Sequence, residues 1–329
     1  MPDSSFYAVP AVLLSTIWAD RQSALHPQGE QAGLSAETAW VMFVAGAAIF
    51  LLVMAILALA ILGPERLRRH LAGRAMLVGA GIVFPVAALS ALLIYSLGIA
   101  AAMLRADAPA AVRIEVTGEM WWWRVRYLDD DGQVLFETAN EIRIPVDQPV
   151  DLALASRNVV HSFWVPNLAG KLDMVPGHVN RMRLHATRAG RYRGQCAEYC
   201  GAQHANMMFD VQVLAGPDFQ AWLQSQRRPA APPGDADGRL RQGRQVFLQA
   251  CARCHAVRGT PAAGTVGPDL THVGGRLSLG AGMLPNNVGT LAGWIAGSQH
   301  IKPGNGMPAF DHLSGEQLRA VAHYMESLQ

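Results

Sequence analysis

All four cysteines of the chain lie in two short runs that are dense in metal-ligating residues. The first run, residues 196–207, reads CAEYCGAQHANM, and the second run, residues 251–255, reads CARCH. Soft sulfur ligands together with imidazole select copper, zinc or iron–sulfur clusters. A sparse, paired set of cysteines is a poor disulfide framework and a good signature of metal or cofactor binding.

The first run offers two thiolates, an imidazole and a thioether, from Cys196, Cys200, His204 and Met207. A thioether favours copper over zinc. One more ligand is expected from elsewhere, and His161 is the obvious candidate because it opens a loop after an expected strand. A disulfide and a structural zinc site are the alternatives. A Cys–Cys bridge alone, however, accounts for neither the spacing of His204 nor the presence of Met207.

In the second run, the order Cys-x-x-Cys-His is the attachment signature of a c-type haem. The thiols of Cys251 and Cys254 add across the two haem vinyl groups, and the imidazole of His255 then lies under the iron. A dithiol redox motif would need a thioredoxin-like βαβ context, and a zinc site would need a second Cys/His pair. The sequence offers neither, so covalent haem is the prediction.

The sixth iron ligand is expected to be methionine or histidine, and a Met/His pair raises the potential. The downstream candidates are Met283, Met307 and Met325. Met325 has the helical spacing of a core residue. Met283 lies in a glycine-rich turn and remains an alternative candidate for the ligand. We prefer Met307, because the segment KPGNGMPAF at 302–310 is a helix-free loop that can reach over a haem face.

Two long apolar segments precede the ligand runs. Residues 39–62 and 75–104 are stretches of 24 and 30 residues without a charge, and a membrane span needs ~20 apolar residues. The loop between them, 63–74, holds four arginines, whereas the tail 1–38 holds only Arg21. Because basic residues stay on the cytoplasmic side, we expect this loop in the cytoplasm and both termini on the outer side.

Beyond residue 104 the sequence predicts two outward-facing domains. Residues 105–226 show short alternating patterns with turn signals between them, which favour an all-β sandwich; the Asp-Gly pair at 131–132 predicts a hairpin turn. The expected strands are residues 112–117, 122–128, 141–146, 150–155, 179–185 and 209–214. Residues 227–238 are rich in Pro, Ala and Gly and predict a linker. Residues 239–329, which open with helical spacing at 239–250, form the second domain.

Composition agrees with a membrane protein that carries soluble domains. The 329 residues are 51% hydrophobic and 16% charged, against a usual charged share of ~25%. These values exclude a disordered or fibrous chain. The formal net charge is +2, and basic and acidic residues balance at 14 each between 105 and 228, so we expect no nucleic-acid partner.

The first run resembles the binuclear copper site, CuA, of cytochrome c oxidase subunit II. The upstream residues HSFWVP at 161–166, with KLD at 171–173 and Pro-Gly at 176–177, look like that family's His-Ser-x-x-Val-Pro loop. The resemblance also includes the hairpin of two apolar segments and covers about residues 39–226. It implies a cupredoxin-like sandwich behind a transmembrane hairpin.

The resemblance implies a role for each ligand of the first run. Cys196 and Cys200 would each bridge both copper ions, His161 and His204 would each cap one copper, and Met207 would be a weak ligand of one copper. Two coppers that share two thiolates delocalise one electron, so their geometry changes little between oxidation states. A rigid, sulfur-rich cage therefore lowers the reorganisation needed for electron transfer, and its surroundings tune the potential.

The same resemblance implies three further features. The main-chain carbonyl of Glu198 would be a weak copper ligand, and its side chain would help to hold a magnesium or manganese ion at the border with subunit I. Residues GEMWWW at 118–123 are similar to the family motif Gly-x-x-Trp-x-Trp, in which the first tryptophan, here Trp121, receives the electron. Trp122 and Trp123 are expected to be packing residues. Where many members carry a glutamate of a proton pathway, this chain has Val78.

The second run and its surroundings resemble the class I cytochrome c family over about residues 239–329. The loop around Met307 is similar to the one that supplies the axial methionine in that family. Residues GPDL at 267–270 resemble the family's loop on the histidine side, where Pro268 would pack beside the proximal ligand. This resemblance implies an all-α domain.

Together the resemblances imply the electron-input subunit of a respiratory haem–copper oxidase. Electrons would pass from a cytochrome c or a quinol:cytochrome c reductase to the haem c, then through the Trp121 region to CuA and into subunit I. Subunit I would hold the centre that reduces oxygen to water, coupled to proton pumping. Subunit III and membrane lipid are the other implied partners. The implied location is a bacterial-type plasma membrane, with the termini and both metal domains on the periplasmic side.

Other functions fit the same residues. The chain could be the input subunit of a nitric oxide reductase that uses the same copper domain, and nothing in the sequence separates this reading from an oxidase. A stand-alone copper carrier or redox sensor is a non-enzyme alternative. A quinol oxidase subunit is rejected, because that branch would have lost copper ligands that are all present here.

Overall fold

The structure is a computed structural model that describes residues 22–103, 109–231 and 237–329. Contacts between residues divide the chain into a helical unit, 31–108, and a second unit that contains the rest. Most of the tail predicted at 1–38, the last residue of the predicted second span, and residues 232–236 of the predicted linker lie outside the described residues.

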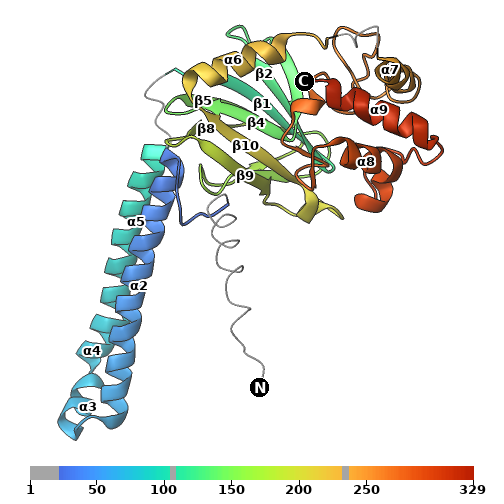
Figure 1. Ribbon diagram of the computed structural model, residues 1–329. Coiled ribbons are helices and arrows are strands. Elements are labelled where there is room, and N and C mark those ends of the chain that lie inside the picture. Colours follow the sequence, from blue (N-terminus) through green and yellow to red (C-terminus); the bar gives the residue numbers. More distant parts are fainter. Residues whose placement is uncertain (1–21, 104–108, 232–236) are drawn as a thin grey trace, which may run out of the picture. The chain divides into compact units, whose positions relative to one another are not determined.

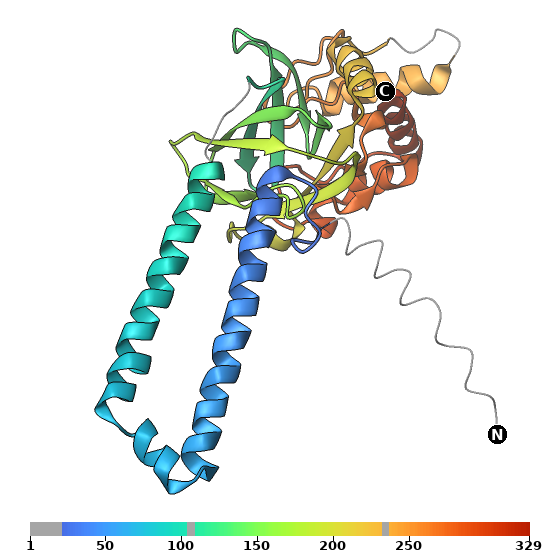
Figure 2. The same ribbon diagram turned by 90° about the vertical axis from the view of Figure 1, so that its left-hand side faces the viewer.

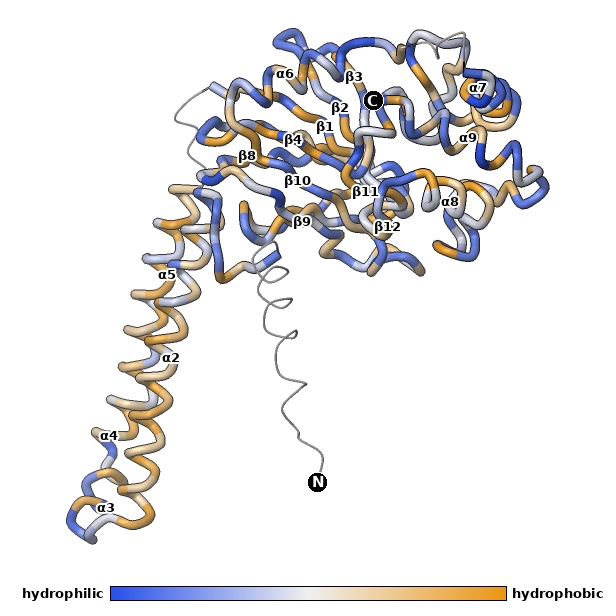
Figure 3. Tube along the Cα trace, in the orientation of Figure 1, coloured by the Kyte–Doolittle hydropathy of each residue, from blue (hydrophilic) through white to orange (hydrophobic). Residues whose placement is uncertain are grey.

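The helical unit consists of two long apolar segments joined by a short helix. Its elements are α2 (Glu30–Leu62), α3 (Glu65–Leu71), α4 (Arg74–Val78), the π-helical turn η1 (Gly79–Val83) and α5 (Phe84–Met103). Both α2 and the continuous run from Arg74 to Met103 are long and apolar enough to cross a membrane. Figure 3 shows that hydrophobic residues cover these helices along most of their length.

The helical unit differs from the sequence prediction in detail. Helix α2 begins at Glu30 rather than at residue 39, because its first residues are polar and the apolar criterion does not detect them. The predicted loop 63–74 contains the basic helix α3. The turn η1 ends two residues before Pro85, and a widened turn of this kind accommodates a proline that cannot donate to the helix ladder.

The second unit begins with a β-sandwich, residues 109–227, which we call the sandwich domain. One sheet has the strand order β3-β2-β1-β5-β8, and the other has the order β4-β10-β9-β6-β7. Figures 1 and 2 show the two sheets from perpendicular directions. The strands are β1 (Val112–Glu119), β2 (Trp122–Leu128), β3 (Val134–Ala139), β4 (Glu141–Pro145), β5 (Pro149–Ser156), β6 (His161–Trp164), β7 (Leu172–Met174), β8 (Asn180–His185), β9 (Gly190–Cys196) and β10 (Met208–Leu214).

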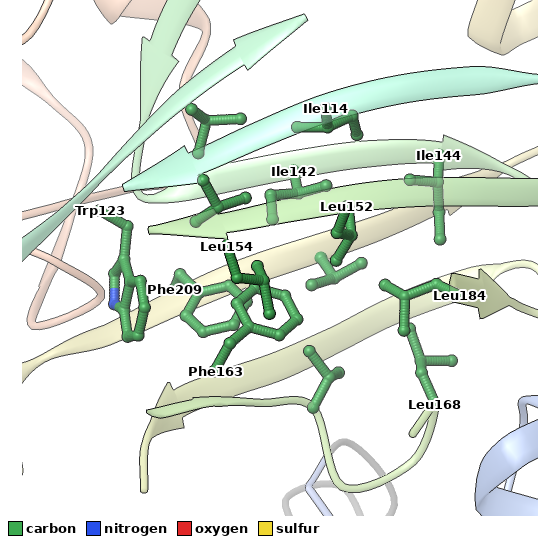
Figure 4. Packing of buried hydrophobic residues seen from close by; sticks show 14 of the residues in the cluster. Ile114, Trp123, Ile142, Ile144, Leu152, Leu154, Phe163, Leu168, Leu184 and Phe209 are labelled. Atoms are coloured by element: carbon green, nitrogen blue, oxygen red, sulfur yellow. The ribbon is translucent and has the colours of Figure 1, made fainter. Parts of the chain in front are cut away.

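Alternating side chains of the two sheets meet in one apolar core. Strand β1 buries Ile114 and Val116, as its sequence alternation predicts. Aromatic rings fill the end of the core next to the ligand run, where Phe163 stacks on Phe209 at 4.7 Å between ring centroids and Trp123 packs edge-on against Phe163 (Figure 4). This core holds β6, β9 and β10 rigidly at the place where the ligand residues begin.

The prediction of an all-β sandwich is confirmed, and the six predicted strands are present within two residues of their ends. Four further strands, β3, β6, β7 and β9, were not predicted. Strands β6 and β7 are only four and three residues long, and β9 contains Gly190 and Gly194, which weaken a strand pattern. The prediction that His161 opens a loop is wrong, since it is the first residue of β6.

After α6 (Gly216–Arg227), the chain continues into a helical domain, residues 237–329, which we call the C-terminal domain. Its elements are α7 (Gly238–Ala250), the 3₁₀ turn η3 (Val273–Gly275), β11 (Ser278–Leu279), β12 (Leu284–Pro285), α8 (Val288–Ile301) and α9 (Gly315–Ser327). Ser314 begins α9 with a capping box. Gly243 lets α7 approach α9, because a Cβ there would lie 2.1 Å from the carbonyl oxygen of Ala320. The predicted all-α domain is thus confirmed.

Candidate metal centres

The ligand residues predicted for copper come together at one end of the sandwich. The Sγ atoms of Cys196 and Cys200 lie 3.7 Å apart, so the two thiols are not joined in a disulfide, which needs about 2.05 Å. The ligand atoms of His161, Cys196 and Cys200 lie within 4.8 Å of one another, and all three residues are buried. This cluster joins the last residue of β9 to the first residue of β6.

The remaining predicted ligands complete two neighbouring groups around the sulfurs. Cys196 Sγ lies 3.8 Å from His161 Nδ1 and 3.2 Å from the carbonyl oxygen of Glu198. Cys200 Sγ lies 3.6 Å from His204 Nδ1 and 3.8 Å from Met207 Sδ. Each sulfur therefore has one imidazole and one weaker donor beside it, and the two sulfurs face each other. This soft, dense donor set fits two copper ions.

The pKa values of the two thiols are shifted in opposite directions. The hydrogen bond with Cys200 is the main cause that lowers the pKa of Cys196 to about 3, with a further contribution from His161, while burial opposes the shift. The hydrogen bond with Cys196 and burial together raise the pKa of Cys200. One thiolate is therefore ready to bind metal, and copper must displace the second proton.

Asn158, which the sequence analysis did not single out, orients the histidine from outside the cluster. Its Oδ1 lies 3.1 Å from Nε2 of His161, so Nε2–H donates to the amide oxygen while Nδ1 faces Cys196. A second partner of this kind fixes the tautomer and the ring angle of a metal-binding histidine. An asparagine three residues before a histidine carries no recognisable sequence signal.

Gly118 of β1 leaves room for the His161 ring. A Cβ at this position would lie 2.7 Å from Cδ2 and 2.9 Å from Cγ of His161. A Gly118→Ala substitution is therefore expected to push the imidazole away from Cys196 and to lower copper affinity by roughly 10–100-fold. Copper titration of the purified chain measures this change.

Gly170→Ala is the matched control for that titration, because a Cβ at Gly170 would meet nothing within 4 Å. Copper affinity is expected to stay at the wild-type value in this variant. Equal affinity in the Gly118 variant would show that the ring position is not limited by this contact.

Trp121 is buried directly between the copper ligands and the C-terminal domain. Its Nε1–H donates to the carbonyl oxygen of Cys200 at 2.9 Å. On the far side of the indole, a Cβ on Gly304 would lie 3.6 Å from Cζ3 of Trp121. One aromatic ring thus contacts both the backbone of a candidate copper ligand and the loop that carries Met307. Trp123 belongs to the sandwich core, whereas Trp122 faces the cavity described next.

A cavity of about 630 Å³ lies between the two domains and is lined mostly by apolar side chains. The C-terminal domain contributes the predicted attachment residues Cys251 and Cys254, both predicted axial ligands, His255 and Met307, and Pro268. The sandwich domain contributes a set that lies on or next to the β1–β2 turn: Glu119, Met120, Trp121, Trp122 and Asn140. The size and the lining chemistry fit a haem.

His255 is oriented as an iron ligand would need to be. Its Nδ1 lies 2.8 Å from the carbonyl oxygen of Pro268, so Nδ1–H donates there and Nε2 is left for a metal. Burial lowers the pKa of His255, which favours the neutral ring that binds metals. Gly267 packs tightly beside it, because a Cβ at that position would lie 2.4 Å from Cε1 of the ring.

The structure separates the three methionine candidates. Met307 and Met325 line the cavity, whereas Met283 is not among its lining residues. Met325 is buried within α9 and packs in the core of the C-terminal domain. Met307 lies in a loop outside the helices and lines the same cavity as His255, and its N–H donates to Asn305 Oδ1 at 2.7 Å.

Arg276 is a further cavity residue that the sequence analysis missed. One guanidinium nitrogen donates to the carbonyl oxygen of Asp269, while its Nε is buried with no hydrogen-bond partner. A half-buried cation with an unsatisfied donor is costly in a cavity lined mostly by apolar side chains. A carboxylate, such as a haem propionate, would supply the missing acceptor and charge, so Arg276 also fits a haem.

Buried charged groups join the two domains. Glu141 and Asp210 of the sandwich domain accept from Leu277 N and Ser278 Oγ of the C-terminal domain, both at 2.7 Å. Arg124 Nη2 donates to the carbonyl oxygen of Thr265 at 3.1 Å. These side chains are largely buried and also form ion pairs within the sandwich domain, so the bonds across the boundary fill the remaining hydrogen-bonding capacity of buried groups.

Comparisons with known families agree with both sites. The family model for the periplasmic domain of cytochrome c oxidase subunit II matches residues 124–214. The family model for cytochrome c matches residues 240–329. The two matched ranges contain all of the predicted copper and haem ligands.

Similar proteins carry the corresponding name. The chain is 40% identical to cytochrome c oxidase subunit 2 of Alkalihalophilus pseudofirmus over 219 residues, which are 66% of this chain and 61% of that protein. It is 31% identical to the subunit 2 of Bacillus subtilis over 231 residues, which are 67% of this chain and 63% of that protein. The chain thus spans less than two thirds of the length of these relatives.

Among solved structures, the chain is similar to the periplasmic domain of subunit II of cytochrome oxidase from Bradyrhizobium japonicum. The sequence identity is 28%, the TM-score is 0.34, and the match covers 37% of this chain and 97% of that one. A heme-copper terminal oxidase dimer matches with 24% identity and a TM-score of 0.30, over 41% of this chain and 99% of that one. Residues 124–214 are thus similar to the family described as the periplasmic domain of cytochrome c oxidase subunit II, and residues 240–329 are similar to the cytochrome c family.

Proposed function

We propose that this chain is the electron-input subunit of a respiratory haem–copper oxidase. It receives electrons from a cytochrome c-type donor on a haem c of its C-terminal domain. It passes them to a binuclear CuA centre in its sandwich domain and then to subunit I, which reduces oxygen to water and pumps protons. The observation that carries this proposal is the position of Trp121, which contacts Cys200 on one side and the Met307 loop on the other.

The C-terminal domain would hold the haem in the cavity that the sandwich domain closes on one side. Cys251 and Cys254 would attach it, and His255 and Met307 would bind its iron. Pro268 fixes the His255 ring through its carbonyl oxygen. Bound there, the haem supplies a reversible one-electron couple. The cavity excludes water from it, and a Met/His ligand pair sets a high potential.

The sandwich domain would hold the copper pair with side chains from a rigid core. Cys196 and Cys200 would bridge the ions, His161 and His204 would cap them, and Met207 and the Glu198 carbonyl would be weak ligands. Asn158 keeps the His161 ring in place. The protein thus has little to rearrange when an electron arrives, which lowers the barrier to transfer.

The indole of Trp121 packs between the two sites. Its Nε1–H donates to the Cys200 carbonyl, and the loop at Gly304 lies near the other edge of the ring. Trp121 would therefore hold an aromatic side chain between the haem-binding residues and a copper-binding residue.

The direct test is metal content, a redox difference spectrum and the internal transfer rate of the purified full chain. Two coppers per covalent haem, with a c-type visible band and copper reduction that follows haem reduction, are expected. A chain with haem but no copper would contradict the proposal and leave a membrane-anchored cytochrome c.

The nature of the partner chain needs a separate measurement. Subunit I, and subunit III beside it, should co-purify with the chain from the membrane, with the two apolar helices as anchor and both metal domains on the periplasmic side. Oxygen consumption by that complex supports the oxidase, whereas nitric oxide consumption would make this chain the input subunit of a nitric oxide reductase.

A magnesium or manganese ion at the border with subunit I forms part of the same proposal. The Glu198 side chain is exposed, and Oε2 lies 3.3 Å from the ammonium of Lys171, which also lies 3.3 Å from Asp173. A carboxylate so placed is available to a metal that a partner chain helps to bind. No proton route is assigned to this chain, because it has Val78 where many members of the family carry a glutamate.

A Met307→Ala substitution is expected to leave the haem attached and to lower its potential, because the thioether that stabilises the reduced iron is lost. The visible spectrum and a redox titration measure both changes. The matched Met283→Ala variant should keep the wild-type spectrum and potential. An unchanged spectrum in the Met307 variant would move the axial role to another residue.

A further inference from the structure

Lys302 is a buried cation that the proposed electron route does not use. Its side chain is 3% exposed, and none of the salt bridges among the described residues includes it. Its ammonium instead donates to three carbonyl oxygens, those of Trp121 at 2.7 Å, Asn206 at 2.7 Å and Gly280 at 3.1 Å. A lysine ammonium carries three N–H donors, so every donor is satisfied.

The three acceptors connect the parts of the molecule that matter for electron transfer. Trp121 is the residue between the two sites, and Asn206 lies between the candidate copper ligands His204 and Met207 in the 3₁₀ turn η2 (His204–Asn206). Gly280 belongs to the turn between β11 and β12 of the C-terminal domain. One ammonium therefore ties the C-terminal domain to the copper-ligand turn and to the main chain of Trp121.

The backbone of Lys302 is linked in turn to the candidate haem ligand. Asn305 Nδ2 donates to the carbonyl oxygen of Lys302 at 2.7 Å, and Asn305 Oδ1 accepts from Met307 N at 2.7 Å. A second hydrogen bond joins the same two segments, since Gln203 Nε2 donates to the carbonyl oxygen of Pro303 at 2.9 Å. A short chain of hydrogen bonds thus runs from the Met307 backbone through Lys302 to the copper-ligand turn.

Composition supports a specific need for lysine here. The chain has only two lysines, Lys171 and Lys302, among 27 basic residues. A compact ammonium can point its donors at three converging carbonyls, whereas the planar guanidinium of arginine cannot. Burial lowers the pKa of Lys302 to about 7, but three carbonyl acceptors favour the charged form, because a neutral amine offers only two N–H groups.

We propose that Lys302 is a positioning residue that holds the haem-ligand loop on the copper-ligand turn and so sets the geometry of internal electron transfer. The proposal rests on the proposed function, because it presupposes transfer between the two centres. Without the ammonium, three carbonyl groups lose a hydrogen-bond donor, which destabilises the contact between the two domains. The docked arrangement is therefore weakened while each metal site keeps all of its own ligands.

The first test is the Lys302→Met variant of the full chain, which keeps the length and loses the donors. We expect both copper ions, the mixed-valence signal and the haem band to be retained, and reduction of the haem by an external donor to keep its rate. Internal transfer from haem to copper should slow by about tenfold or more. Lys302→Arg should not restore the rate, although it restores the charge.

Arg113→Met is the matched control, since it removes a cation of the sandwich domain that is half exposed and bonds to Asp130. Its internal transfer rate should equal that of the wild type. A wild-type rate in Lys302→Met, or full rescue by Lys302→Arg, would overturn the proposal. Absence of internal transfer in the wild-type chain would instead overturn the proposed function, so the two failures are distinguishable.

A second test needs no electron transfer. Brief acetylation of the native full chain, read by mass spectrometry, should label Lys171, which is 48% exposed at its side chain, and leave Lys302 at least about 100-fold less labelled. In the Gln203→Ala variant, which loses the neighbouring contact, protection of Lys302 should fall. Labelling of Lys302 at the Lys171 rate in the wild type would show that the ammonium is not held between the domains.

Discussion

A Cys200→Ser variant is expected to keep its covalent haem and to lose the copper pair together with all internal electron transfer. Cys200 Sγ lies within 3.8 Å of three other candidate donors: Cys196 Sγ, His204 Nδ1 and Met207 Sδ. A hydroxyl is a hard ligand and binds copper poorly in such a site. Copper content and the mixed-valence electron paramagnetic resonance signal should both fall to background.

The reciprocal control is Cys251→Ser, which removes a haem thioether and leaves the copper ligands untouched. This variant should retain two coppers and their signal while its haem attachment is impaired. If Cys200→Ser still bound two coppers with the wild-type signal, the assignment of that thiol as a bridging ligand would be wrong.

A Trp121→Leu variant is expected to retain both metal centres and to transfer electrons between them markedly more slowly, because the aromatic side chain that packs between the two sites is lost. The substitution removes the indole that rests on the loop at Gly304 and the N–H that bonds to the Cys200 carbonyl. Flash reduction of the haem, followed at the copper absorption band, measures the rate.

Two further substitutions separate the roles of that side chain. Trp121→Phe keeps an aromatic ring near Gly304 but loses the hydrogen bond to Cys200, so an intermediate rate is expected. Trp222→Leu is the matched control, because that tryptophan packs against Tyr127 and Phe136 and is not among the residues that line the cavity. Equal rates in the wild type and Trp121→Leu would show that electrons take another path.

Much of the site could be predicted from the sequence because its ligands lie close together along the chain. Four copper donors fall within residues 196–207, and three haem-binding residues fall within 251–255. Such spacing follows from the ligand chemistry. It can be recognised from the local sequence, without knowledge of contacts between distant residues. The two apolar spans could also be predicted from the sequence, because length and composition alone identify them.

The rest depends on contacts between residues far apart in sequence. Lys302 was part of a loop expected to cover a haem face, and its acceptors are backbone carbonyls, which every residue has and no pattern marks. Gly118 acts on His161 only because β1 and β6 meet at one end of the core, while the local contact of Asn158 with His161 has no recognisable sequence signal. The short strands β6 and β7 escaped detection because three or four residues cannot show an alternation.

The buried acidic residues at the domain boundary have a consequence for how this protein can change over evolutionary time. Arg143 and Arg191 pair with Glu141 and Asp210 inside the sandwich domain, and residues 277 and 278 of the other domain give each carboxylate one further donor. A mutation that alters the conformation of the 277–278 segment removes that further donor from two largely buried carboxylates. The two domains are therefore expected to change together in evolution. A cytochrome domain taken from another protein would not supply the donors at residues 277 and 278.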